Sequence, residues 1–209
     1  GTDFRFIPDS LFGNVLALSG ESETYISIPG EAVSGEESLT IAGWIWLRSA
    51  KSGQVFFDFG KNGSSHVSAA PAGTGAGEGL RVQLVAGGKT WATASAAVPV
   101  NRWSHIAVVI DVPSKTMSTY LNGELAGETK DISLELKQLF DFDNDRNNQL
   151  FIGKSLGSEK TFLNAKLSDF RVYRIPLTQR QIARIYFTAL RGGNPQAGRR
   201  GQAEPNLQV

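Results

Sequence analysis

The stretch AKLSDFRVYRIPLTQRQIARIY, residues 165–186, joins a strand-like run to a helix-like run. In its first half, Leu167 stands on one parity of the chain, whereas the next large apolar residue, Phe170, stands on the other. Such a slip in the alternation is typical of a β-bulge, in which one strand carries an extra residue. We therefore expect a bulge at Ser168 and Asp169.

The second half of this stretch predicts a helix. Thr178 is suited to the N-cap position, and Gln181 completes a Thr-x-x-Gln capping box. Leu177 precedes the cap and can pack against Ile182 as a hydrophobic staple. We expect a single short amphipathic helix over residues 178–189, close to the C-terminal end.

Outside this helix the chain consists almost entirely of short runs rich in β-branched and aromatic residues, separated by Gly, Pro, Asn and Ser. The Asn122-Gly123 pair tolerates the positive φ angles of a type I′ turn and predicts a tight hairpin. The expected fold class is therefore all-β with antiparallel strands. The runs are TYISIP, SLTIAGWIWL, GQVFFDFG, GLRVQLVA, KTWATAS, RWSHIAVVIDV, KTMSTYLNG and NQLFIG.

Two of these runs differ in their apolar pattern. In GQVFFDF, Phe57 and Phe59 share one face while Gln54 and Asp58 take the other, which predicts a half-buried strand. The run SHIAVVID is apolar on both faces. A strand of that kind belongs in the middle of a sheet.

Composition narrows the class of protein. The 209 residues are 41% hydrophobic, which is enough for one large core, and we expect one domain over residues 1–189. Residues 190–209 have little to bury and predict a flexible linker or tail. A formal net charge of +1 argues against nucleic acid as a partner, and no apolar run reaches the length of a membrane span. The chain has no cysteine, which excludes disulfides and thiolate chemistry.

Taken in order, several motifs resemble one known family. They are ALSGESETYISIP, SLTIAGWIWL, NRWSHIAVVID with the YLNGE hairpin, LFIG, and AKLSDFRVYRIPLTQRQIARIY. This set is similar to the laminin-G-like domains of the concanavalin A-like lectin/glucanase superfamily, over roughly residues 16–187. The resemblance implies a jelly-roll sandwich of two curved antiparallel sheets. It also implies an accessory module of a larger secreted or surface protein that often acts on glycans.

The sequence argues against a hydrolase. Laminarinase-type relatives of this fold carry acidic residues as Glu-x-Asp-x-x-Glu on one strand, because retaining cleavage needs two carboxyl groups about 5 to 5.5 Å apart. No such cluster occurs here. His105 follows the Trp-x-His pattern of the family, where it resembles a packing residue, and His66 lies in no motif. We therefore expect a noncatalytic protein.

Two segments are candidates for a metal site. In similar domains, an acidic residue of the strand before the closing helix often binds a structural calcium ion, and backbone carbonyls complete the shell. This resemblance nominates Asp169, with a carbonyl from the corner at Gly20, although Asp169 could instead pair with a neighbouring arginine such as Arg171. The loop DFDNDRNN, residues 141–148, imitates the start of an EF-hand but lacks its glycine and its closing glutamate, so a solvated turn is favoured there.

Sugar binding in such folds generally needs an exposed aromatic ring with polar neighbours. Trp46 stands where a polar residue is more usual, Trp91 lies in a Gly-bounded hairpin, and Arg81 alternates on a strand with Val82. These residues, Trp46, Arg81 and Trp91, are the predicted carbohydrate site. We expect a lectin-like accessory module of an exported glycan-processing protein, secreted, periplasmic or at the cell surface, whose partners are a polysaccharide and further domains of its own polypeptide. The alternative is a structural or protein-interaction spacer without a sugar site.

Overall fold

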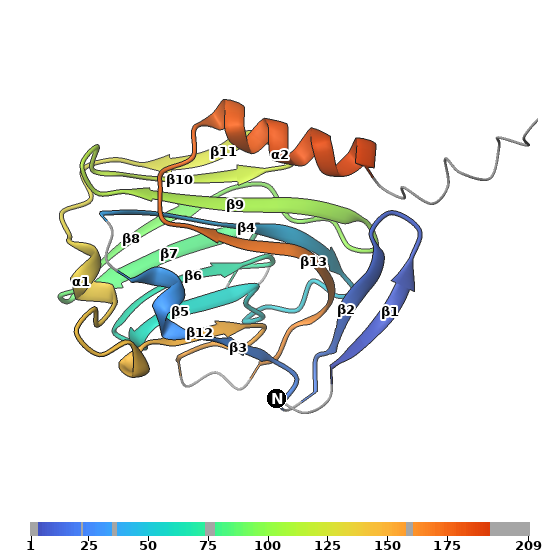
Figure 1. Ribbon diagram of the computed structural model, residues 1–209, viewed down its shortest axis with the longest axis horizontal. Coiled ribbons are helices and arrows are strands. Elements are labelled where there is room, and N and C mark those ends of the chain that lie inside the picture. Colours follow the sequence, from blue (N-terminus) through green and yellow to red (C-terminus); the bar gives the residue numbers. More distant parts are fainter. Residues whose placement is uncertain (1–3, 22, 35–36, 74–77, 158–160, 193–209) are drawn as a thin grey trace, which may run out of the picture.

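A computed structural model describes residues 4–21, 23–34, 37–73, 78–157 and 161–192. They form two antiparallel sheets packed face to face, with one longer helix on the outside (Figure 1). The predicted all-β sandwich with a C-terminal helix is confirmed.

The first sheet has seven strands. The SHIAVVID run forms β9 (Trp103–Asp111), which has a neighbouring strand on each side, so its predicted position in the middle of a sheet is confirmed. The strands in spatial order are β1 (Arg5–Asp9), β2 (Gly13–Ser19), β13 (Asn164–Tyr173), β4 (Ser38–Leu47), β9 (Trp103–Asp111), β10 (Thr116–Leu121) and β11 (Glu124–Thr129).

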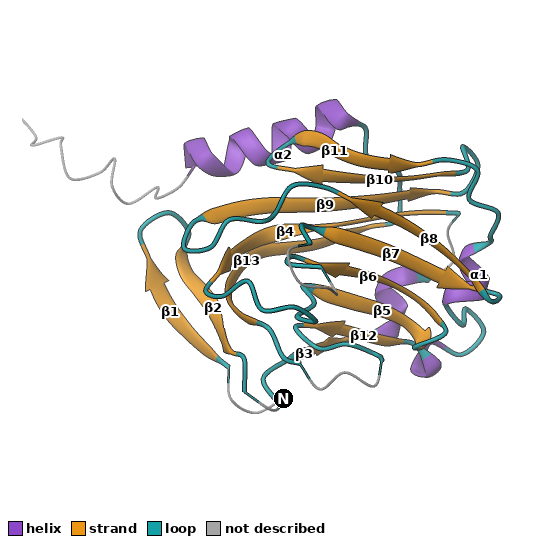
Figure 2. Ribbon diagram, turned by 180° about the vertical axis from the view of Figure 1, so that it is seen from behind, coloured by secondary structure: helices purple, strands orange, loops and turns teal. Residues whose placement is uncertain are grey.

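The second sheet has six strands and lies against the first, as both views of the fold show (Figures 1 and 2). Its strands in spatial order are β3 (Ile26–Ile28), β12 (Gln149–Ile152), β5 (Phe57–Asn62), β6 (Ser65–Ala70), β7 (Arg81–Ala86) and β8 (Lys89–Ala94). The main core fills the space between the sheets and includes Leu18, Ile45, Phe57 and Val108.

A second apolar cluster lies on the outer face of the seven-stranded sheet. The helix α2 (Gln179–Gly192) runs along this face (Figure 1) and buries Ile182 and Leu177 against Ala42 and Ala107. This cover explains why β4 and β9 are apolar on both faces. The predicted capping box is confirmed, because Gln181 Oε1 accepts a hydrogen bond from Thr178 N at 2.8 Å. The helix ends at Gly192 rather than near residue 189, and the predicted linker beyond it, residues 193–209, lies outside the described residues.

The expected bulge is confirmed in β13. Ser168 pairs with Trp44, but Arg171 pairs with Ala42, so β13 carries one residue more than β4 at this point. Asp169 has a φ of 49°, in the left-handed region. Opposite the bulge, a Cβ added at Gly43 would lie 3.1 Å from the Phe170 ring, so the glycine makes room for the extra residue.

The turn between β10 and β11 is also as predicted, with φ angles of 54° at Asn122 and 86° at Gly123. The expectation of a single helix was incomplete. A one-turn helix, α1 (Leu136–Leu139), and two 3₁₀ turns, η1 (Gly30–Val33) and η2 (Asp145–Asn147), occur as well. The signal for α1 was its own capping box, which uses Glu135 in place of the usual Ser or Thr.

The half-buried character predicted for the GQVFFDF run was wrong. Gln54 and Asp58 are as buried as the phenylalanines beside them. Their polar atoms are satisfied inside the protein, since Gln54 Oε1 accepts a hydrogen bond from Asn164 N at 2.9 Å and Asp58 is bonded to three groups. Alternation placed Asp58 on the correct face, but the segment that supplies Ser155 and Leu156, which is distant in the sequence, covers it.

Candidate functional site

Polar side chains gather on the outer face of the six-stranded sheet. In the strand register Asp58 pairs with Ser68, and Ser68 pairs with Gln83, so the three lie side by side across β5, β6 and β7. Successive side chains of a strand point to opposite faces, so His66 and Arg81, each two positions away along its strand, lie on this same face. The register thus brings five polar residues onto one face.

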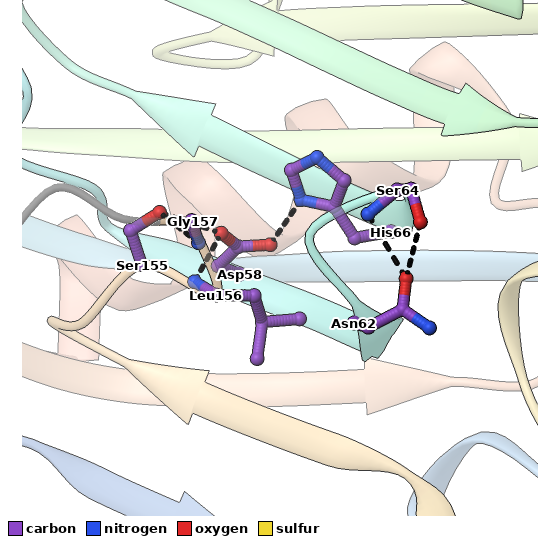
Figure 3. A network of polar contacts seen from close by, with 7 residues as sticks. All are labelled: Asp58, Asn62, Ser64, His66, Ser155, Leu156 and Gly157. Carbon is purple, nitrogen blue, oxygen red and sulfur yellow. Dashed lines mark hydrogen bonds and ion pairs between the residues drawn. The ribbon is translucent and has the colours of Figure 1, made fainter. Parts of the chain in front are cut away.

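Asp58 is the centre of a hydrogen-bond network (Figure 3). Its side chain is fully buried, and Oδ1 lies 2.5 Å from Nδ1 of His66. Its Oδ2 accepts hydrogen bonds from Ser155 Oγ at 3.1 Å and from Leu156 N at 2.8 Å. Because both carboxylate oxygens are engaged, Asp58 holds its neighbours in place and is not available to a ligand.

The network determines how His66 faces its surroundings. A carboxylate oxygen accepts, so Nδ1 of the imidazole carries a proton, and Nε2 is left for another hydrogen bond. Figure 3 shows Nε2 pointing away from Asp58. His66 also lines a pocket on this face, so Nε2 can form a hydrogen bond with a bound hydroxyl.

This pocket has a volume of about 160 Å³. Within it the Arg81 guanidinium lies beside the Gln83 amide, whose oxygen can accept from Nε at 2.8 Å and from Nη2 at 2.9 Å. None of the described residues that line the pocket is a carboxylate or an aromatic residue. The lining residues are Ser52, Gly53, Val55, His66, Ser68, Ala70, Arg81, Gln83 and Ser155, and the pocket they form is called the His66 groove below.

The three residues of the predicted sugar site do not come together. Arg81 lies in the His66 groove. Trp91 is on the neighbouring strand β8, but it pairs with the buried Leu84 and packs against the core, on the opposite face of the sheet. Trp46 lies on the other sheet.

Trp46 is half-buried in a cluster on the outer face of the seven-stranded sheet. The Lys166 ammonium lies over its ring, 4.1 Å from the centroid, and Trp103 meets it edge to face at 5.9 Å. Lys166 also pairs with Asp9 at 2.6 Å, which ties the β1–β2 hairpin to β13. One face of the Trp46 ring is therefore already occupied by a cation.

The residues predicted to hold calcium are separated. Gly20 lies beside the start of β13, because the preceding Ser19 pairs with Asn164. Asp169 lies further along β13, beyond Leu167, where the pairing with β2 ends. Asp169 Oδ1 accepts a hydrogen bond from Arg171 Nε at 2.6 Å. Gly20 and Asp169 therefore do not fit a single ion shell, and calcium binding by Asp169 stays a prediction.

The acidic loop at residues 141–148 is organised around its first carboxylate. Asp141 Oδ1 accepts from the backbone of Asp143 and Asn144, and Oδ2 accepts from the Asn147 side chain at 2.7 Å. This pattern describes a hydrogen-bonded turn, the interpretation that the sequence favoured. In the described ranges, no group of three or more His, Cys, Asp or Glu side chains is arranged to hold a metal ion.

The two histidines have opposite roles. His105 is 1% exposed and packs against both Trp44, at a ring distance of 5.3 Å, and Tyr186 of α2, in the packing role that the sequence predicted. Burial lowers its pKa to about 4, so the ring is neutral. Sequence reasoning missed His66, although one signal was present, namely a carboxylate inside an apolar strand with a histidine on the strand after the next turn.

The chain matches a laminin G family model, described as the concanavalin A-like lectin/glucanases superfamily, over residues 19–183. A comparison with curated protein sequences finds no significant match. Several solved structures share the fold. One is domain 4 of a GH43 extracellular arabinanase from Geobacillus stearothermophilus in complex with arabinotriose, at 15% identity and a TM-score of 0.70, with coverage of 89% of this chain and 82% of that one.

Two further structures extend this set. The binding domain of botulinum neurotoxin serotype G has 14% identity and a TM-score of 0.66, with coverage of 90% of this chain and 45% of that one. A heptameric SAP-like pentraxin from Limulus polyphemus has 16% identity and a TM-score of 0.56, with coverage of 81% and 80%. This chain thus spans less than half of the neurotoxin domain, and at such identities the likeness concerns the fold.

Proposed function

The chain belongs to the concanavalin A-like lectin/glucanases superfamily, and from this premise we propose that it is a noncatalytic carbohydrate-binding module of an exported glycan-processing protein. Its sugar site is the His66 groove, with His66, Ser68, Arg81 and Gln83 as the binding residues. Arg81 belongs to the site that the sequence predicted, and the other three replace the tryptophans.

The observation that carries this proposal is the fixed orientation of His66. Its Nδ1 is held by the buried Asp58 carboxylate, so Nε2 is held in a fixed position, where it can form a hydrogen bond with a ligand in the groove. The Arg81 guanidinium supplies donors and Ser68 supplies a hydroxyl. Sugar hydroxyls both donate and accept, and a rigid set of acceptors and donors binds them with little loss of side-chain entropy.

The comparisons support a binding role. The arabinanase domain was solved with arabinotriose, and a further similar structure, of botulinum neurotoxin type C at 19% identity and a TM-score of 0.63, is described as dependent on interaction with two ganglioside molecules. Export of this chain is part of the proposal because the arabinanase is described as extracellular. No helix in the described part of the chain is long and apolar enough to cross a membrane.

The chemistry of the groove favours binding over hydrolysis. Retaining and inverting glycosidases both need two carboxyl groups that flank the scissile bond. No described residue that lines the groove is a carboxylate, and both oxygens of the adjoining Asp58 are already hydrogen-bonded. We therefore expect no turnover of β-glucans or aryl glycosides by the purified protein.

The test is a binding titration with arabinotriose and a panel of neutral oligosaccharides. We expect dissociation constants from micromolar to millimolar, or roughly −8 to −4 kcal/mol. Arg81→Gln should weaken binding by about tenfold, because it removes charge-assisted hydrogen bonds. The matched control Arg180→Gln removes the same charge from an exposed position on α2 and should leave affinity unchanged.

Two outcomes would contradict the proposed site. If Arg81→Gln and His66→Gln leave affinity unchanged while Trp46→Ala weakens it, the sugar lies on the other sheet. If the wild-type protein binds no glycan on an array of plant and host polysaccharides, the spacer alternative holds. Circular dichroism of each variant checks that the fold is retained.

A further inference from the structure

A second polar pocket lies outside the seven-stranded sheet, where the β1–β2 hairpin meets the end of β4. It has a volume of about 250 Å³. Its lining residues are Arg5, Ile7, Ala17, Ser19 and Arg48, and it is called the two-arginine pocket below. It shares no lining residue with the His66 groove, which lies on the other sheet.

Strand pairing brings the two arginines to one place. Arg5 of β1 pairs with Ala17 of β2, and Ser19, two positions further along β2, pairs with Asn164 of β13. On the other side of β13, Arg48 N donates a hydrogen bond to Asn164 O at 3.0 Å. The pocket therefore depends on the β1–β2 hairpin, the start of β13 and the end of β4, which are far apart in the sequence.

Both guanidinium groups are available to a ligand. Arg5 and Arg48 are exposed, and neither side chain has a hydrogen-bond or ion-pair partner among the residues that the structure describes. The nearby Asp9 carboxylate does not neutralise them, because it is held by Lys166 at 2.6 Å and by Trp103 Nε1 at 3.2 Å. Burial opposes ionisation of Asp9 and is the largest single influence, but the hydrogen bonds from Lys166, Leu11 N and Trp103 and the charge of Lys166 together outweigh it and lower the pKa of the carboxyl group.

We propose that the two-arginine pocket binds the carboxylate or sulfate group of an acidic polysaccharide. A guanidinium presents a planar fork of donors that matches an oxyanion bidentately, and two forks facing one pocket can hold a single anionic group. Ile7 and Ala17 supply apolar surface for the adjoining sugar ring. The module then has two separate contacts with glycan, one on each sheet.

The charge pattern favours a polysaccharide over the other polyanions. Recognition of anionic lipid surfaces typically uses clusters of four to eight basic residues, and nucleic acid binding depends on many phosphate contacts. The pocket has two arginines, and the formal net charge of the chain is only +1. One carboxylate or sulfate group of an acidic sugar chain fits this local charge.

The test is affinity electrophoresis in gels that contain polygalacturonate, dextran sulfate or neutral dextran. Wild-type protein should be retarded by one or both acidic polymers and not by neutral dextran, and the retardation should fall as salt rises. Arg5→Gln and Arg48→Gln should each weaken binding by about tenfold, and the double variant should abolish the retardation. Arg180→Gln, with the same loss of charge, should behave as wild type.

Three results would overturn the inference. Unchanged retardation of the double variant would show that the pocket is not used, and an equal loss in Arg180→Gln would show general charge attraction. Binding to vesicles of anionic phospholipid without binding to either acidic polymer would assign the pocket to a membrane surface. If Arg81→Gln loses retardation by the acidic polymers and the double variant does not, the anion binds in the His66 groove. The titration with neutral oligosaccharides tests the His66 groove independently of this result.

Discussion

On the outer face of each sheet, a histidine can be compared with a strand carboxylate, and the two pairs are arranged in opposite ways. On the six-stranded sheet, Asp58 is buried and holds His66 at the edge of a pocket. On the seven-stranded sheet, Asp169 turns toward Arg171, and His105 is buried beneath α2. The same two residue types thus form a fixed polar site on one face and are separated on the other.

The difference lies in what covers each face. The helix α2 brings Tyr186 over Trp44, with ring centroids 5.3 Å apart and nearly parallel, and this cover leaves His105 Nδ1 buried without a hydrogen-bond partner among the described residues. On the six-stranded sheet, the segment that supplies Ser155 and Leu156 covers Asp58 and leaves His66 at the pocket. A histidine next to a buried carboxylate can serve recognition, whereas a histidine enclosed by aromatic rings serves packing.

The largest expected effect comes from removing the buried carboxylate. Asp58→Ala should lower the free energy of unfolding by about 3 to 5 kcal/mol, because it leaves the partners of a buried hydrogen-bonded charge unsatisfied. Urea denaturation followed by tryptophan fluorescence measures this loss. Asp169→Ala is the matched change on the other face. Measured without calcium, it should cost less than about 1 kcal/mol, because the ion pair of Asp169 with Arg171 is partly exposed. Equal losses in the two variants would remove the contrast between the faces.

A smaller effect should appear in the pH dependence of stability. His105 has a pKa of about 4 in the folded protein, below the unfolded value of about 6.5, so the unfolded chain binds the proton first as the pH falls. The stabilisation is present above pH 6.5 and is lost as the pH falls through 4, with a total of at most about 3 kcal/mol. In His105→Phe this part of the pH dependence should be absent. A wild-type curve that matches the variant between pH 6.5 and 4 would contradict the assignment.

The calcium prediction for Asp169 is expected to have the smallest effect. An ion that binds only the folded chain stabilises it by about 2.7 kcal/mol at a hundredfold excess over its Kd. Chelation should then lower the melting temperature by several degrees, since about 1 kcal/mol shifts a domain of this size by roughly 2 to 4 °C. Asp169→Asn should remove most of this response. Identical melting curves for the wild type with calcium and with excess chelator would leave Asp169 as the ion-pair partner of Arg171 alone.

Much of the fold was predictable because its signals are local. The parity slip at Asp169, the Asn122-Gly123 turn and the capping box at Thr178 each depend on the backbone preferences of a few neighbouring residues, and all three are present in the structure. The doubly apolar β9 was also recognisable, because a strand covered on both faces cannot alternate. The helix end at Gly192 and the short α1 were missed, since helix termini carry weaker signals.

The candidate site was less predictable for a physical reason. Alternation assigns a side chain to one face of a strand, but it does not say whether that face is covered or which distant residues lie beside it. The pattern placed Asp58 on the correct face of its strand but did not predict that its side chain is buried. Trp91 was expected at the sugar site but packs against the core. Of the three predicted sugar-binding residues, only Arg81 lies in the His66 groove.

The sequence by itself determined most of the strands, the Asn-Gly turn, the bulge, the closing helix and the family, because these follow from short-range backbone preferences and from an ordered set of motifs. It did not predict β1, β2 or β6. Only the tertiary structure decided which polar groups meet. Asp58 bonds to Ser155, and Arg5 shares a pocket with Arg48, because sheet register and loop packing bring together residues that the chain keeps far apart. Recognition chemistry depends on those encounters, so it became visible only in the folded protein.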